Sequence, residues 1–171
     1  MKYIIDDFFT KKTFWLHVFI PIMLGSLIYV FLREDNILIF QIFKFIGIYD
    51  MIDALRTYTM EWRSFIPEWI YYSLPDGLWV YSLNVFCLFF TGYYIDSKTF
   101  IFPFVGIFLG VGSEVFQYLK IIPGTFDILD LVVCLIGVIA AFILYKLRKK
   151  EYLKEYNASL KVNNNINNIE I

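Results

Sequence analysis

The sequence predicts an all-α protein, a polytopic transmembrane helix bundle with four spans. Its 171 residues are 59% hydrophobic and 21% aromatic, whereas soluble domains are roughly 45–50% apolar. Four apolar stretches come close to the ~20 residues that a helix needs to cross a bilayer. Basic or turn-forming residues flank each stretch. We therefore expect a single integral membrane domain covering residues 1–155.

The four predicted spans are residues 14–32, 78–94, 99–119 and 126–145. The first apolar run is longer than that of a cleavable signal peptide, and no small-residue cleavage pattern follows it, so we interpret it as a retained helix. Residues 73–77 have the composition of a turn before the second span. The Asn-rich segment 156–171 follows a basic run and is expected to be a disordered or loosely helical cytoplasmic tail.

The segment between the first two spans has the pattern of amphipathic helices. Residues 37–49 are strongly apolar but too few to span, and we interpret them as a helix lying in the interface. A re-entrant segment or a tilted fifth crossing are the alternatives, and a fifth crossing would separate the termini. Residues 50–63 predict a second amphipathic helix, whose polar positions are Asp53, Arg56 and Glu61.

The distribution of basic residues predicts the orientation. With four spans, ten of the 15 Lys and Arg residues fall on the side of the termini and five on the other side. Because cytoplasmic loops carry an excess of Lys and Arg, both termini are predicted to be cytoplasmic. The net charge of −1 and the lack of a recognition motif argue against a nucleic-acid partner.

Four acidic residues mark a candidate site at the outer ends of three spans: Asp76, Glu114, Asp127 and Asp130. Charges inside a membrane segment are rare because each costs ~2.5–3.5 kcal/mol at mid-bilayer on insertion scales. Gln117 shares a helix face with Glu114, three residues away. Small residues on the third and fourth spans predict that these two helices pack together, with their carboxylates at the seam. The small residues are Gly106, Gly110, Ser113, Cys134, Gly137 and Ala141.

Two interpretations of these acids stay open. Asp76 and Asp127 stand at helix starts, where capping explains them as well as function does. Glu114 and Asp130 lie inside their helices, which favours a functional or polar-network role. Close carboxylates require a shared proton or a cation. The sequence offers Arg63, Lys98 and Lys120 as candidates, although the predicted topology puts Lys98 on the opposite side of the membrane. We predict no metal site and no cofactor.

A short motif adds a resemblance. Glu114-x-x-Gln117, Pro123-Gly124, Asp127-x-x-Asp130 and the small-residue apolar helix that follows together resemble the VanZ-like family of small polytopic membrane proteins. The resemblance covers residues 112–141. It implies a bacterial inner-membrane protein of the cell envelope, in a family whose named member is linked to resistance to teicoplanin-type glycopeptides.

Three functions are therefore considered. The first is a non-enzymatic VanZ-like envelope protein whose outward acidic pocket binds or modifies the surroundings of a lipid-linked envelope component, with the bilayer as its other partner. The second is a structural or accessory membrane subunit, in which the acids are interhelical glue and caps. The third is an intramembrane acid/base enzyme acting on a lipid headgroup. No Ser or Cys nucleophile with a base partner is evident, so the sequence leans away from enzymatic activity.

Overall fold

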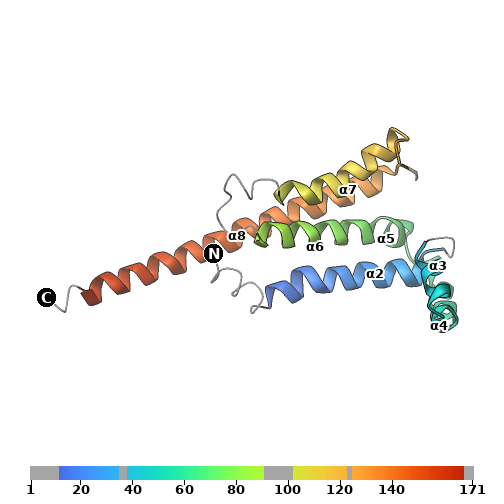
Figure 1. Ribbon diagram of the computed structural model, residues 1–171, viewed down its shortest axis with the longest axis horizontal. Coiled ribbons are helices and arrows are strands. Elements are labelled where there is room, and N and C mark those ends of the chain that lie inside the picture. Colours follow the sequence, from blue (N-terminus) through green and yellow to red (C-terminus); the bar gives the residue numbers. More distant parts are fainter. Residues whose placement is uncertain (1–11, 35–37, 91–101, 123–124, 168–171) are drawn as a thin grey trace.

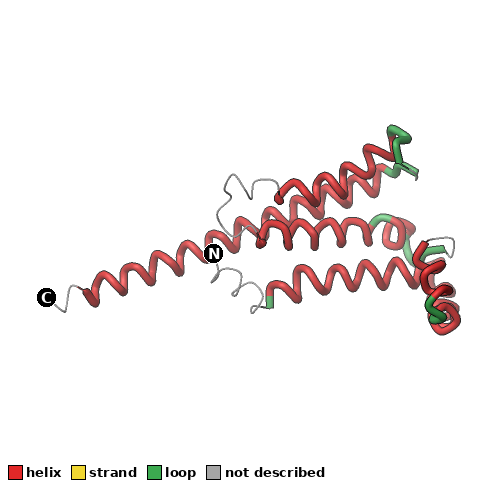
Figure 2. The backbone as a smooth tube through the Cα atoms, viewed as in Figure 1, coloured by secondary structure: helices red, strands yellow, loops and turns green. Residues whose placement is uncertain are grey.

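The computed structural model describes residues 12–34, 38–90, 102–122 and 125–167. Every regular element in these ranges is a helix (Figure 2), which confirms the predicted all-α class. In chain order the elements are η1 (Trp15–Phe19), α2 (Ile20–Leu32), α3 (Leu38–Phe45), α4 (Tyr49–Trp62), η2 (Arg63–Phe65), α5 (Glu68–Tyr72), α6 (Leu74–Phe90), α7 (Phe102–Tyr118) and α8 (Ile128–Asn167).

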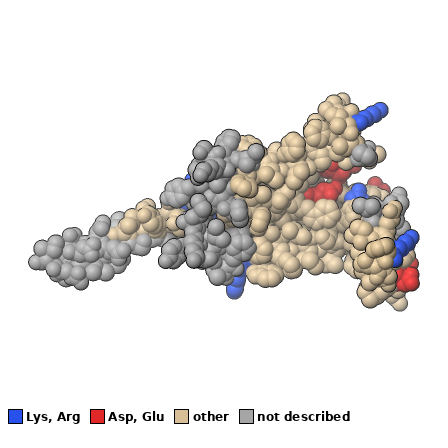
Figure 3. Space-filling view, viewed as in Figure 1, with Lys and Arg blue, Asp and Glu red and all other residues tan. Residues whose placement is uncertain are grey.

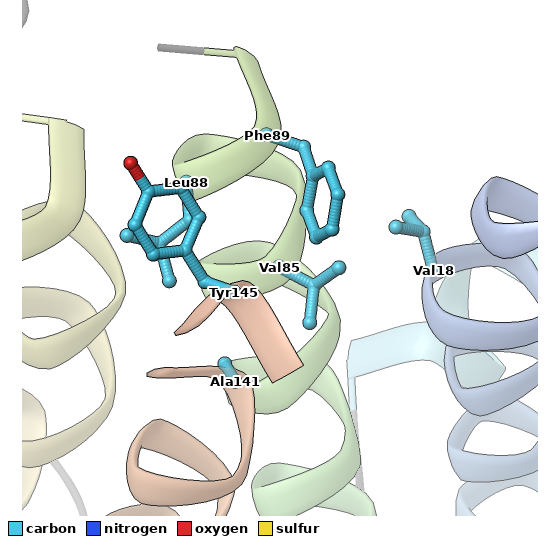
Figure 4. Packing of buried hydrophobic residues seen from close by; sticks show 6 residues of the cluster. All are labelled: Val18, Val85, Leu88, Phe89, Ala141 and Tyr145. Carbon is cyan, nitrogen blue, oxygen red and sulfur yellow. The ribbon is translucent and has the colours of Figure 1, made fainter. Parts of the chain in front are cut away.

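Helix α6 is the centre of the bundle. It packs most extensively against α8, then against α7 and α2, and α2 and α7 lie on opposite sides of it (Figure 1). An apolar cluster joins three elements where Val85, Leu88 and Phe89 of α6 meet Val18 of η1 and two residues of α8 (Figure 4). The α8 residues are Ala141 and Tyr145. A central helix with partners on several faces can bring distant side chains to one site.

Glycines allow α6 to approach its neighbours closely. A Cβ at Gly137 of α8 would lie 2.6 Å from the carbonyl oxygen of Gly77. A Cβ at Gly110 or Gly106 of α7 would meet the side chains of Val80 and Asn84, respectively. The expected contact between α7 and α8 is present, but these glycines face α6 rather than each other. Their spacing shows which residues share a face, whereas the choice of neighbour depends on how the helices assemble.

Two of the described helical segments are long and apolar enough to cross a membrane, Trp15–Leu32 and Ile128–Ala158. Two shorter apolar helices, Leu74–Phe89 and Phe104–Tyr118, lie where the other two spans are predicted. Helix α6 begins at Leu74, inside the segment predicted as a turn. Proline is tolerated this early in a helix, because the N–H that it lacks would have no intrahelical partner there. Residues 91–101, which include parts of both predicted spans, lie outside the described residues.

Helix α8 continues beyond the predicted fourth span to Asn167. It therefore passes through the basic run and most of the segment expected to be disordered or loosely helical. No Gly or Pro follows Gly137 in the sequence, and the intervening residues include many good helix formers. An Arg148–Glu151 ion pair of 3.0 Å lies along this extension. Figure 1 shows the helix projecting past the other helices.

The segment after α2 folds as two helices at the end of the bundle (Figure 1). Helix α3 has 8 residues, about 12 Å at 1.5 Å per residue, so it is too short to cross a bilayer by itself. Gly47, with φ of 77°, adopts the left-handed conformation between α3 and α4 that glycine favours. Helix α4 agrees with the amphipathic helix predicted for residues 50–63 to within one residue at each end.

Arg56 departs from the expected polar face of α4. Its side chain is only 2% exposed, and it donates hydrogen bonds to the carbonyl oxygens of Val30, at 2.7 Å, and Arg33, at 2.6 Å. Thr59 donates a third, of 2.8 Å, to the carbonyl of Phe31. The last carbonyls of a helix have no partner within it. Helix α4 therefore caps the end of α2, and its arginine is structural.

Candidate functional site

A cavity of about 290 Å³ lies between α6, α7 and α8, and we call it the acidic cavity. Asp76 contributes from the first turn of α6, and Ser113, Glu114 and Gln117 contribute from the C-terminal part of α7. Figure 3 shows acidic atoms gathered in a hollow of the surface, with basic atoms beside them. The remaining lining residues are Trp79, Val80, Leu83, Leu109, Gly110 and Cys134. Three of the five candidates, Asp76, Glu114 and Gln117, therefore share one cavity.

Glu114 is the most enclosed acid of the group. It is only 6% exposed, and it is the one charged residue of α7. Its Oε2 accepts a long hydrogen bond of 3.5 Å from the backbone N–H of Asp127. The part of the chain that the structure describes provides no second hydrogen bond or ion pair to this carboxylate. The carboxylate is therefore free to accept a hydrogen bond from a bound group.

Asp127 has a local structural role. It directly precedes α8, and its Oδ1 accepts a hydrogen bond of 2.8 Å from the backbone N–H of Leu129. This is the geometry of an N-cap, in which a side-chain oxygen satisfies one of the free N–H groups of the first turn. Asp127 is exposed and is not among the cavity-lining residues. Of the two roles expected for it, capping is the one that the structure contains.

Asp130 lies next to the acidic cavity without lining it. It is close enough to interact electrostatically with both Asp76 and Glu114. Its Oδ1 is buried and has no hydrogen-bond partner among the described residues. Because it stands in the first turn of α8, the positive end of the helix dipole partly offsets its charge. The three carboxylates thus form one interacting group.

Of the basic residues expected to neutralise the acids, those that the structure describes are not found in the acidic cavity. Arg63 donates to the hydroxyl of Tyr72 at 2.8 Å and to Glu34 Oε1 at 3.4 Å. Lys120 is exposed on the turn after α7, with φ of 57°. Lys98 lies outside the described residues. Neither Arg63 nor Lys120 lines the acidic cavity.

Arg33, at the end of α2, is the basic residue that interacts with Asp76. Its guanidinium lies 4.9 Å from the ring centre of Tyr29. The Tyr29 ring in turn lies 5.2 Å from that of Trp79, which lines the acidic cavity. Arg33 is not among the cations that the sequence indicated near the acids. The available signal was its position at the outer end of the first predicted span, the same end as Asp76.

The lining groups define what the acidic cavity can bind. Carboxylates accept hydrogen bonds, and a carboxamide can both donate and accept, so ammonium and hydroxyl groups suit this site. Ser113 donates its hydroxyl to the carbonyl of Gly110 at 2.7 Å. Among the described residues no three His, Cys, Asp or Glu side chains are grouped so that they could hold a metal ion. His17 lies elsewhere, with its Nδ1 2.7 Å from the Tyr81 hydroxyl.

No family model, curated protein or solved structure matches this chain. The resemblance of residues 112–141 to the VanZ-like family therefore stays a prediction.

Proposed function

We propose that this chain is an integral membrane protein with four spans, formed by η1 with α2, α6, α7 and α8. Its outer surface supports this proposal, because large apolar side chains are exposed along three of these helices. A continuous apolar exterior of this kind suits lipid rather than water. Helices α6 and α7 each have 17 residues, the lower end of the spanning range. Examples of the exposed residues are Leu24, Leu27, Phe108, Leu109, Ile136 and Ile139.

The orientation follows from the basic residues. The excess of Lys and Arg on the side of the termini assigns both termini to the cytoplasm. The acidic cavity then opens on the outer face, since Asp76 is at the start of α6 and Glu114 near the end of α7. The VanZ-like resemblance adds the bacterial inner membrane as the location. Aromatic side chains of α5, such as Trp69, suit the lipid–water boundary at this end.

Within that membrane, the protein acts as a VanZ-like envelope protein that binds a lipid-linked component at the outer face and alters antibiotic susceptibility. One observation carries this proposal: Asp76 and Glu114, from two different helices, line the same cavity inside an apolar bundle. Unpaired carboxylates in such a setting are costly, so their presence favours a functional role. This role is binding and requires no chemical step.

A structural role is the second candidate, and a specific observation favours it. Asp127 caps α8, and its backbone N–H also bonds to Glu114. The bond to Glu114 ties the end of α7 to the start of α8, as interhelical glue would. Under this alternative, the protein is an accessory subunit, and its acids stabilise the hairpin formed by α7 and α8. For the enzymatic alternative we find no comparable observation.

Substitutions of Glu114 and Asp130 separate these two functions. Glu114→Gln and Asp130→Asn keep the shape of each side chain and remove its charge. The measurements are susceptibility of cells to a teicoplanin-type glycopeptide and protein abundance in the membrane, each compared with cells that lack the gene. The proposed function requires the effect on susceptibility to disappear while abundance stays at the wild-type level. Abundance falling together with the effect would support the structural role.

Glu61→Gln provides a matched control. Glu61 is an exposed acid on α4, so this substitution removes the same charge away from the acidic cavity. It should leave both susceptibility and abundance unchanged. If wild-type cells and cells without the gene respond equally to the antibiotic and to other envelope stresses, the proposed envelope function is wrong.

A further inference from the structure

A second cavity, of about 480 Å³, continues from the acidic cavity along α6 toward the other end of the bundle. Trp79 and Leu83 line both cavities, so the two share a wall on the face of α6 between α2 and α7. We call the second cavity the apolar groove. Its other lining residues are Phe14, Val18, Ile22, Ser82 and Phe86.

The apolar groove suits a hydrocarbon chain. Six of its seven lining side chains are hydrophobic. The one hydroxyl group among them, that of Ser82, already donates to the carbonyl of Leu78 at 2.8 Å. The groove is lined by α2 and α6, whose neighbouring surface exposes Leu24 and Leu27. A chain from the surrounding lipid can therefore enter it sideways without burying an unpaired polar group.

The polar end of this path carries charges of both signs. At the acidic cavity, Glu114 is 94% buried (6% exposed) and accepts only the long bond from Asp127 within the described part of the chain. Arg33 reaches the same end through its stack on Tyr29, which contacts Trp79. Its guanidinium forms no ion pair with a described acid, so it can receive an anion.

We propose that the acidic cavity and the apolar groove together bind one zwitterionic phospholipid that carries a primary ammonium group. The ammonium group lies between Asp76 and Glu114 and donates to their carboxylates. The phosphate lies toward Arg33, and one hydrocarbon chain follows the groove past Trp79 and Leu83. This inference names the ligand class of the proposed function and therefore rests on it.

Charge and shape select this class. A headgroup with only a phosphate would face the two lining carboxylates, Asp76 and Glu114, with Asp130 close by, and be repelled. A soluble amine would satisfy the carboxylates but leave the apolar groove empty and bring no anion to Arg33. A quaternary ammonium has no N–H to donate, so it would lose the hydrogen bond that a buried carboxylate requires. Only the primary ammonium lipid meets all three parts of the site.

The test uses the full-length protein, purified in detergent and stripped of native lipid. Binding of three lipids with identical dioleoyl chains is measured by native mass spectrometry: phosphatidylethanolamine, phosphatidylcholine and phosphatidylglycerol. The wild-type protein should bind phosphatidylethanolamine at least about tenfold more tightly than the other two, a difference comparable to one charge-assisted hydrogen bond. Equal affinity for all three lipids would overturn the proposal.

Two variants test the two halves of the site. Glu114→Gln should remove the preference for phosphatidylethanolamine, because it weakens binding of the ammonium lipid and lessens the repulsion of phosphatidylglycerol. Leu83→Trp fills the shared wall and should weaken all three lipids together. If Glu114→Gln fails to fold, as judged by size-exclusion chromatography, Asp76→Asn replaces it with the same expected result. If a folded Glu114→Gln or Asp76→Asn protein still preferred phosphatidylethanolamine, the proposal would also be overturned.

The lipid-binding measurement tests the lipid inference, and the antibiotic measurement in cells tests the envelope function, so a failure of one can be told from a failure of the other. Loss of the antibiotic effect in Glu114→Gln cells without any lipid preference in vitro would end the lipid inference and leave the envelope function standing. A clear preference for phosphatidylethanolamine without any effect of the gene on antibiotic susceptibility would end the envelope function and leave the lipid inference standing. Binding of methylammonium alone, as strong as that of phosphatidylethanolamine, would show that the apolar groove does not contribute and would overturn the lipid assignment.

Discussion

Arg56 of α4 donates a hydrogen bond of 2.7 Å to the carbonyl oxygen of Val30 in the last turn of α2. The same guanidinium bonds to the carbonyl of Arg33 and covers the ring of Phe40, 4.1 Å from its centre. One buried side chain thus ties the outer helices α3 and α4 to the end of α2. It also fixes the backbone of Arg33, whose side chain interacts electrostatically with Asp76.

Arg56→Gln should destabilise the protein strongly. The substitution breaks both hydrogen bonds to partly buried carbonyls, and a buried group left unpaired costs about 1–3 kcal/mol. We expect a loss of about 2–4 kcal/mol, seen as a lower melting temperature in detergent by fluorescence-detected size-exclusion chromatography. Arg148→Gln, which breaks the exposed pair with Glu151, should change the stability by at most about 1 kcal/mol. Equal melting temperatures for the two variants would contradict the capping role.

Gly137→Ala should destabilise the packing of α8 on α6. The added Cβ would lie 2.6 Å from the Gly77 carbonyl oxygen and 3.2 Å from the backbone nitrogen of Tyr81. Both atoms belong to the backbone and cannot rotate away, so the helices must separate, at a cost of about 1–3 kcal/mol. The readout is membrane abundance together with melting temperature.

Gly112→Ala is the matched control for this packing. A Cβ at Gly112 would meet only Phe108, at 3.8 Å, an ordinary contact distance. Alanine also favours helix over glycine by about 1 kcal/mol. The Gly112 variant should therefore equal or exceed the wild type in stability. If both alanine variants behaved alike, the close approach of α6 and α8 would be in doubt.

Substitutions at Asp127 should separate capping from binding. Asp127→Ala removes the acceptor for the Leu129 N–H and should cost about 0.5–2 kcal/mol. Asp127→Asn keeps an acceptor oxygen and should retain most of the stability. Because Asp127 does not line the acidic cavity, the asparagine variant should also keep the antibiotic effect. Loss of that effect in a stable Asp127→Asn protein would assign Asp127 to the site.

Labelling of single cysteines should reveal the orientation. Lys120→Cys lies on the turn after α7 and Lys150→Cys on the α8 extension, and both positions are exposed. In intact cells a membrane-impermeant maleimide should label only Lys120→Cys. The native cysteines, Cys87 and Cys134, are buried and should give little background. Labelling of Lys150→Cys in intact cells would show that the α8 extension is outside the cell, which would contradict the proposed four-span topology with cytoplasmic termini.

Part of the candidate site could be predicted from sequence and part could not. The acids were recognisable because charge is rare in apolar segments, and their clustering at one end followed from simple up-and-down connectivity. The separate roles of Asp127 and Glu114 required coordinates. Asp127 has a local partner two residues along the chain, whereas Glu114 shares its cavity with Asp76 of another helix. Local partners can be inferred from spacing, and distant ones cannot.

The sequence by itself determined the helical class, the positions of the apolar segments and the residue types at the helix starts. These properties depend on composition and on contacts within a few residues, which are visible along the chain. Only the tertiary structure decided that α6 is central, that Arg56 is buried and that Arg33 approaches Asp76. Segments that are apolar on nearly every face carry little periodic signal. Their rotation about the helix axis, and therefore their neighbours, is set by how side chains and glycines fit together in the assembled bundle.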